Sequence, residues 1–160
     1  FRMKKGGKLN RAIFDGDMIN TPSMLCVEDH LDGLLWAKEI GLEGLFERSR
    51  NNLRIVEEWV EKTDWVDFLA ESAEIRSSTS VCLKVVHPRF LSMSGEEKSK
   101  LVKEITGKLS KEGTAHDVGS YKDAPPGFRI WCGPTIEPDD VKNALEGLDR
   151  AFRNRLTQQA

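Results

Sequence analysis

Four segments of the chain carry apolar side chains at intervals of three and four residues, the period of an amphipathic helix. The first helix is predicted from about Pro22, with Thr21 as its N-cap, to a break at Gly41. The second is predicted over about residues 42–61, because apolar residues there face one side while glutamate and arginine face the other. We expect the second helix to place its apolar side against other parts of the protein.

Two further helices are predicted in the second half of the chain. The sequence Ser94-Gly95-Glu96-Glu97 matches a capping box, which favours the start of a helix, and Gly113 favours its end. Another helix is predicted from about Pro138, where apolar residues repeat every three or four positions before a polar tail.

Stretches rich in β-branched and aromatic residues predict three strands. Residues 80–86 are almost continuously apolar, which predicts a strand covered on both faces. Short strands are predicted over about residues 114–118 and 128–132, joined by a loop that contains Pro125-Pro126-Gly127. Residues 1–20 show no period, so this segment is predicted to be irregular.

The order of these elements predicts an α/β (α+β) fold, in which helices pack on one face of a short sheet. The chain has 160 residues, a length that can bury a core without disulfides or metal ions.

Composition and charge exclude several classes of protein. The 24 lysine and arginine residues nearly balance the 26 aspartate and glutamate residues, which argues against nucleic acid as a partner, because binding to phosphates needs clustered positive charge. No stretch approaches the roughly 20 apolar residues of a membrane span. The 3 cysteines are odd in number and widely spaced, which is typical of buried thiols in a cytoplasmic protein. The histidines have no spacing typical of metal ligands, so no metal site is predicted.

Two features of the sequence indicate anion binding. Asn20 and Thr21 stand at a predicted helix start, where free N–H groups and the helix dipole favour a phosphate; an ordinary N-cap is the alternative. Arg129 follows the Pro-Pro-Gly turn at the mouth of an apolar strand, where a guanidinium can hold a carboxylate through two parallel hydrogen bonds. A strand-edge arginine that reaches water is the alternative there, and local sequence alone favours both alternatives.

Three motifs, in the same order along the chain, resemble the phosphoserine aminotransferase family of class V pyridoxal-phosphate enzymes. They are residues 1–25, which include Asn20-Thr21-Pro22-Ser23, then residues 80–84 and residues 123–131. The resemblance extends over essentially the whole chain and matches the C-terminal part of the family. It implies the small C-terminal domain of a fold-type I aminotransferase. It also implies a cytoplasmic homodimer that acts in serine biosynthesis, with pyridoxal 5'-phosphate at the subunit interface.

The resemblance implies roles for single residues. Asn20 and Thr21 match residues that bind the cofactor phosphate of the neighbouring subunit, and Arg129 matches the arginine that holds the substrate α-carboxylate. Relatives usually have His-Tyr-Arg where this chain has Ser120-Tyr121-Lys122. The resemblance therefore implies that these three residues bind the phosphate or the distal carboxylate of the substrate. The ammonium of Lys122 would act as a point charge in place of the planar guanidinium of the usual arginine. No catalytic residue is expected in this chain, because the Schiff-base lysine of the family lies upstream of residue 1.

The resemblance implies that residues 1–22 end the large cofactor-binding domain and residues 23–160 form the small domain. The whole protein is then expected to transfer an amino group between glutamate and 3-phosphohydroxypyruvate, giving phosphoserine and 2-oxoglutarate, and this fragment alone is expected to be inactive. Two alternatives stay open: another class V aminotransferase, of the serine/alanine–glyoxylate type, and a stand-alone non-catalytic α/β binding module.

Overall fold

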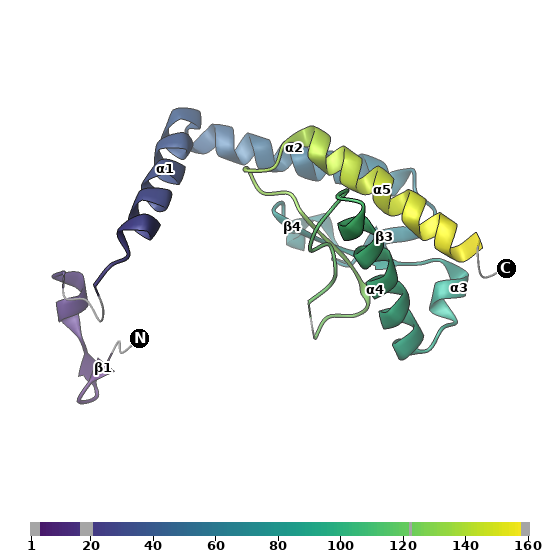
Figure 1. Cartoon of the computed structure of the whole chain (residues 1–160), viewed down its shortest axis with the longest axis horizontal. Helices are drawn as coiled ribbons and strands as arrows, with labels where there is room; N and C mark the ends of the chain where they lie inside the picture. Colours follow the sequence, from purple (N-terminus) through teal and green to yellow (C-terminus); the bar gives the residue numbers. More distant parts are fainter. Residues whose placement is uncertain (1–3, 17–20, 122, 158–160) are drawn as a thin grey trace. The chain divides into compact units, whose positions relative to one another are not determined.

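The computed structural model describes residues 4–16, 21–121 and 123–157 (Figure 1). The chain divides into two compact units, residues 1–42 and residues 43–160. This division concerns packing within the chain, and the predicted end of a large domain at residue 22 stays a prediction.

A short hairpin opens the described part of the first unit. β1 (Lys4–Lys5) pairs antiparallel with β2 (Lys8–Leu9), and a 3-10 helix, η1 (Arg11–Phe14), follows. Gly6 and Gly7 connect the strands with φ angles of 60° and 77°, which suit a two-residue turn that needs positive φ at both positions. The prediction of an irregular segment is wrong here, because the diglycine forms a hairpin turn.

α1 (Met24–Ile40) begins later than predicted, so the prediction of Thr21 as its N-cap is wrong. Ser23 is the N-cap, and its hydroxyl oxygen accepts a hydrogen bond from the N–H of Cys26 at 3.5 Å. Thr21 lies ahead of the helix, since a residue that precedes a proline is disfavoured in helical conformation. The helix ends at Gly41 as predicted, with a φ of 77°.

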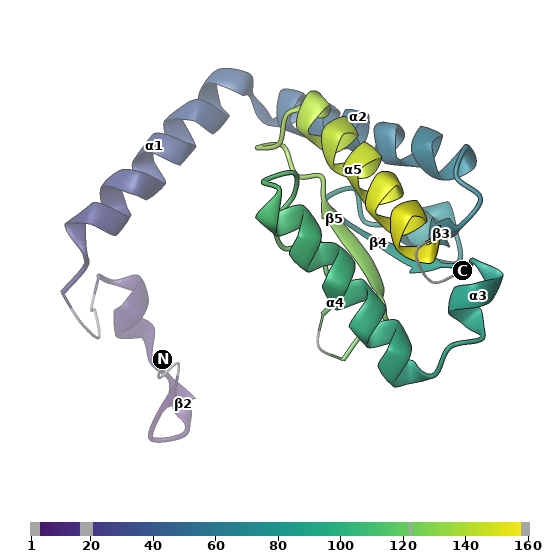
Figure 2. The same cartoon turned by 45° about the vertical axis from the view of Figure 1, so that its right-hand side comes forward.

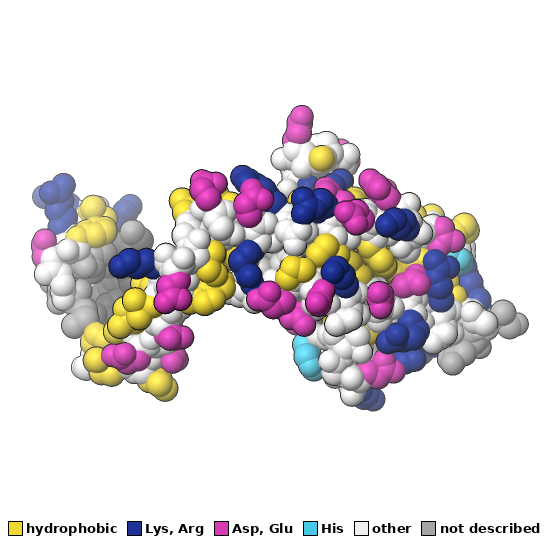
Figure 3. Space-filling model, turned by 90° about the horizontal axis from the view of Figure 1, so that it is seen from above, with side chains coloured by type: hydrophobic (Ala, Val, Ile, Leu, Met, Phe, Trp, Pro, Cys, Tyr) yellow, Lys and Arg dark blue, Asp and Glu magenta, His cyan; other side chains and the backbone are white. Residues whose placement is uncertain are grey.

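No residue of α1 is buried, although the helix is rich in large apolar side chains. Figure 3 shows these side chains on the surface, interspersed with acidic ones. The exposed ones are Met24, Leu25, Val27, Leu31, Leu34, Leu35 and Trp36.

The second unit is built on a three-stranded antiparallel sheet in the order β3-β4-β5. The central strand β4 (Ser80–Val85) pairs with β3 (Val66–Phe68) on one side and with β5 (Gly127–Trp131) on the other. The short sheet is confirmed. The strand predicted over residues 114–118 is wrong: these residues form no strand, and only the next residue, Gly119, makes an isolated bridge with Phe128.

The described helices of this unit cover one face of the sheet, and α5 lies between α2 and α4 (Figure 2). The predictions of the three long helices are confirmed, including the capping box at Ser94. The helical elements are α2 (Leu42–Glu61), η2 (Ala73–Ile75), α3 (Pro88–Leu91), α4 (Gly95–Lys111) and α5 (Pro138–Thr157). None of the described helices is long and apolar enough to cross a membrane.

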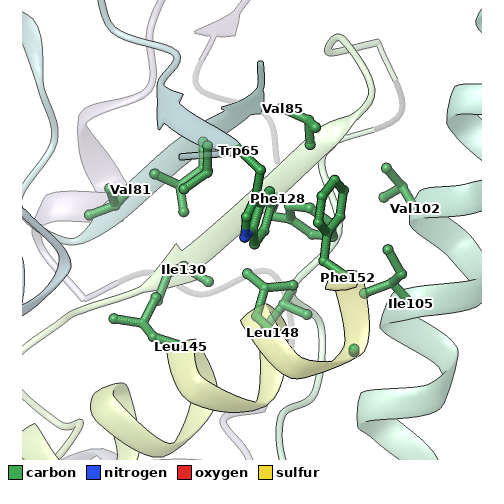
Figure 4. Packing of buried hydrophobic residues seen from close by; sticks show 14 of the residues in the cluster. Trp65, Val81, Val85, Val102, Ile105, Phe128, Ile130, Leu145, Leu148 and Phe152 are labelled. Carbon is green, nitrogen blue, oxygen red and sulfur yellow. The ribbon is translucent and has the colours of Figure 1, made fainter. Parts of the chain in front are cut away.

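The core lies between the sheet and these helices (Figure 4). At its centre the ring of Trp65 stacks on that of Phe152 at 3.8 Å, while the indole N–H of Trp65 donates to the Asp149 carboxylate at 2.7 Å. Along β4 every second side chain is buried and the others are half-buried. The prediction that both faces of β4 are covered is therefore wrong within this chain, because the described helices occupy one face.

Candidate functional site

Arg129 lies in the middle of β5, on the face of the sheet opposite the helices. Its neighbours Phe128 and Ile130 point into the core, so the alternation of a strand turns Arg129 the other way. Cys82 of β4 is its register partner. The Arg129 side chain is nevertheless only 12% exposed, so it does not extend into water as the alternative from the sequence proposed.

The Arg129 guanidinium is held along one edge and covered on one face. Its Nη2 donates to the Asp117 carboxylate at 2.7 Å and also to the backbone carbonyl of Asp117 at 3.3 Å. The guanidinium carbon lies 4.5 Å from the centre of the Tyr121 ring. Nε is buried and has no hydrogen-bond partner among the described residues. These contacts fix the position of the planar, positively charged guanidinium, a group that can bind a carboxylate through two hydrogen bonds.

The backbone of the preceding loop places Asp117 beside Arg129. The N–H of Arg129 donates to the carbonyl of Val118 at 3.0 Å, which fixes the loop against β5. Asp117 has a φ of 53°, a left-handed conformation that aspartate tolerates better than most residues. Because of this conformation, the side chain and the carbonyl of Asp117 both reach the same nitrogen of Arg129, and the chain does not continue as a strand.

The predicted residues after this loop are only partly brought together. The Tyr121 ring contacts the Arg129 guanidinium and Tyr121 is 64% exposed, while Ser120 is half-buried. Both line a cavity of about 280 Å³ against α4, where Lys103 supplies a positive charge. Lys122 lies outside the described residues. Tyr121 is therefore the residue shared by the Arg129 site and this cavity.

Thr21 belongs to the first unit, and Asn20 lies outside the described residues. Thr21 is exposed in the segment ahead of α1. Thr21 is therefore not part of a helix-start phosphate site, because the free N–H groups of α1 follow Ser23. An exposed hydroxyl still suits a phosphate oxygen as a hydrogen-bond donor. Thr21 thus fits one contact to a phosphate group, without help from the helix dipole.

The histidines in the second unit have structural contacts. The ring nitrogen Nδ1 of His87 accepts from the N–H of Arg89 at 3.2 Å and caps α3, and His116 lies 3.0 Å from the hydroxyl of Ser110. Among the described residues, no group of three or more histidine, cysteine, aspartate or glutamate side chains is placed to hold a metal ion.

The cysteines differ in burial, so the prediction of buried thiols holds only for some of them. Cys132 is buried, Cys82 is half-buried and Cys26 is exposed. Burial raises the pKa of the Cys132 thiol to about 12, which makes it a poor nucleophile.

Asp117 is the residue of this site that sequence reasoning missed. It lies twelve positions before Arg129, in a loop without periodicity. No local pattern indicates that the loop folds back onto β5. The sequence therefore predicts the strand and Arg129, whereas only the structure reveals that the Asp117 carboxylate is the partner of Arg129.

Comparisons with known proteins agree with the resemblance seen in the sequence. No family model matches the chain. The chain is 49% identical over 153 residues to the phosphoserine aminotransferase of Methanosarcina barkeri and 50% identical over 153 residues to that of Methanosarcina mazei. Both alignments cover 95% of this chain and 39% of the relative.

A solved structure shows the same fold. The phosphoserine aminotransferase from Bacillus circulans subsp. alkalophilus superimposes with a TM-score of 0.69 over 89% of this chain and 36% of its own, at 15% sequence identity. The resemblance to phosphoserine aminotransferases is therefore confirmed, and the predicted fold class is confirmed with it. The chain spans about two fifths of the length of the curated relatives that it matches.

Proposed function

We propose that this chain is the C-terminal part of a phosphoserine aminotransferase, and that Arg129 holds the α-carboxylate of its substrates. The whole protein would transfer an amino group between glutamate and 3-phosphohydroxypyruvate, giving phosphoserine and 2-oxoglutarate in serine biosynthesis. The similarity to two phosphoserine aminotransferases supports the choice of reaction. The single observation that carries the residue assignment is the fixed guanidinium of Arg129 on the open face of the sheet.

Arg129 would act by binding and orienting the substrate. A guanidinium that binds both oxygens of a carboxylate fixes the direction of the substrate as well as its position, and such fixed geometry is a large part of a catalytic rate. The Tyr121 ring limits the rotation of Arg129 before the substrate arrives. Since both amino-acid substrates carry an α-carboxylate, the same arginine would serve both halves of the reaction.

Pyridoxal phosphate would supply the electron sink for amino transfer in the whole protein. The hydroxyl of Thr21 would contact its phosphate, together with Asn20, in the neighbouring subunit of a cytoplasmic homodimer. Ser120, Tyr121 and Lys122 would contact the phosphate of the substrate, with Lys122 as a point charge in place of the usual arginine.

We expect this fragment alone to be inactive, because the lysine that binds the cofactor covalently would lie in the part of the protein upstream of residue 1. Pyridoxal phosphate mixed with the fragment should be lost completely on dialysis. Cofactor absorbance that survives dialysis and disappears on borohydride reduction would contradict this expectation.

The role of Arg129 is tested in the whole protein by Arg129→Ala. We expect KM to rise for glutamate and for phosphoserine alike. The rise should correspond to a loss of about 1.5–3 kcal/mol of binding free energy, the contribution of hydrogen bonds between charged groups. An unchanged KM for both substrates would remove Arg129 from the carboxylate role.

Arg76→Ala is a closely matched control. Arg76 is 15% exposed, pairs with Glu57 and lies over the ring of Phe68 at 3.5 Å, and its Nε also lacks a partner among the described residues. The substitution therefore removes the same group from a similar environment within the unit. We expect Arg76→Ala to lower stability and to leave KM unchanged.

Another class V aminotransferase, acting on serine or alanine with glyoxylate, remains the second candidate, because Ser120 and Lys122 depart from the usual His-Tyr-Arg pattern. Such an enzyme has no substrate phosphate to bind. Lys122→Ala in the whole protein should impair turnover of phosphoserine far more than turnover of an unphosphorylated amino acid. Equal effects on both substrates would favour the second candidate.

A further inference from the structure

The Asp117–Arg129 pair differs from a permanent structural ion pair in how its two partners are exposed. Arg129 is 12% exposed, whereas the Asp117 side chain is 88% exposed. In the Arg76–Glu57 pair the carboxylate is 36% exposed and extends from a long helix. Moving the Asp117 carboxylate away from Arg129 therefore costs this carboxylate little free energy, because water solvates it already.

The contacts of Asp117 occupy the nitrogen that a substrate carboxylate needs. A planar guanidinium offers two forks for a carboxylate, Nε with Nη2 and Nη1 with Nη2, and both include Nη2. Asp117 accepts from Nη2 through its carboxylate at 2.7 Å and its backbone carbonyl at 3.3 Å. Any carboxylate that binds Arg129 through two nitrogens must therefore displace at least one contact of Asp117.

We propose that Asp117 is an internal carboxylate that occupies Arg129 in the empty site and is displaced by the α-carboxylate of the substrate. A guanidinium that is mostly buried is costly without a counter-charge, and Asp117 supplies one that can be exchanged. Asp117 would also exclude small anions such as chloride and sulfate. This inference rests on the proposed role of Arg129, and it makes Asp117 a residue that sets affinity without taking part in the chemistry.

The test is Asp117→Asn in the whole protein. Asparagine keeps the shape of the side chain and, like aspartate, tolerates a positive φ, so the loop conformation is retained. KM for both glutamate and phosphoserine should fall about two- to fivefold, the range of an exposed ion pair, while kcat stays unchanged. The inhibition constant of glutarate, a dicarboxylate that cannot react, should fall by the same factor, and inhibition by sulfate should become stronger.

Asp67→Asn is the matched control. Asp67 is an exposed carboxylate on β3 that pairs with Lys84 at 3.2 Å, so this substitution removes the same charge from the sheet without touching Arg129. We expect Asp67→Asn to leave all three constants unchanged. Asp117→Gly, which also accepts a positive φ, should act in the same direction as Asp117→Asn.

Two results would overturn the inference. A higher glutarate inhibition constant in Asp117→Asn would show that Asp117 orients Arg129 for binding instead of competing. A constant equal to that of Asp67→Asn would show that Asp117 has no coupling to the carboxylate. Failure of the proposed function gives a different signature, because phosphoserine would then not be a substrate of the unsubstituted protein.

Discussion

The two units of the chain contain similar kinds of apolar residue and bury them to opposite extents. α1 has no buried residue, and its leucines include Leu25 at 72% exposure. In the unit of residues 43–160, Leu148 of α5 is 1% exposed within a core that joins the sheet and the helices. An apolar helix is therefore no sign of a core by itself, because burial also needs a second apolar surface.

The difference has a functional meaning under the proposed function. Monomeric proteins rarely expose a large apolar patch, so a helix with this many exposed apolar side chains needs another surface to cover it. The remainder of a longer aminotransferase would supply such a surface, whereas a stand-alone binding module would leave α1 exposed. The unit of residues 43–160 carries its own core together with Arg129, so we expect it to fold in the fragment.

The largest expected difference between the units is in thiol reactivity. Cys26 is exposed on α1, whereas Cys132 is buried and burial raises the pKa of its thiol to about 12. At mildly alkaline pH Cys132 therefore stays in the unreactive thiol form, and its burial also keeps reagents away from the sulfur. Iodoacetamide labelling of the native fragment, followed by peptide mass mapping, should modify Cys26 and spare Cys132. Equal labelling rates would contradict the compactness of the second unit.

A matched pair of leucine substitutions compares the units directly. Leu148→Ala should lower the free energy of unfolding by about 2–5 kcal/mol, because it leaves a cavity in the core. Leu25→Ala should change it by no more than about 0.5 kcal/mol, since no packing is lost. Urea denaturation followed by near-ultraviolet circular dichroism measures both values. Similar losses for both variants would mean that α1 unfolds together with the second unit.

Two serine N-caps provide a smaller comparison. Ser94→Ala removes a capping box at the start of α4 and should cost about 1 kcal/mol of stability in the same urea experiment. Ser23→Ala removes the cap of α1, where the hydrogen bond is 3.5 Å long, and should leave the main unfolding transition in place. An equal shift of that transition by both variants would show that the cap of α1 also stabilises the second unit.

The smallest expected effect is a dependence on pH. Hydrogen bonds from the backbone N–H and the hydroxyl of Ser94 hold the pKa of Glu97 below its usual value. A carboxylate whose folded pKa is lowered stabilises the protein above its unfolded pKa, about 4.3, and this contribution is lost as pH falls through the folded pKa.

Glu97→Gln tests this dependence. At neutral pH the urea midpoint of the variant should be lower than that of the wild type. In strong acid the two midpoints should be almost equal, because the wild-type carboxyl is then protonated and uncharged, as the glutamine is. A deficit that persists unchanged in acid would show that the charge of Glu97 has no part in the cap.

The long helices of the second unit were predictable because their signals are local. α4 has its capping box at Ser94, and α5 repeats apolar residues over 20 positions. β3 was missed, since its 3 residues are too few for any period, and pairing with β4 alone makes it a strand. The start of α1 was misplaced because Thr21 and Ser23 both flank Pro22, and only the structure distinguishes them.

The candidate site was also predictable only in part. Arg129 follows from its place after the Pro-Pro-Gly turn in an otherwise apolar strand. Asp117 does not follow, because its contact with Arg129 depends on a loop that leaves the extended conformation at a φ of 53°. Interactions between residues far apart in the chain depend on such loop geometry, which composition and period do not encode.

The proposed function requires that this chain is part of an aminotransferase specific for phosphoserine. The most direct test is the rate of amino transfer by the whole purified protein, from phosphoserine to 2-oxoglutarate and from serine or alanine to glyoxylate. We predict rapid transfer from phosphoserine and little transfer to glyoxylate. Rapid transfer to glyoxylate with no turnover of phosphoserine would contradict the claim.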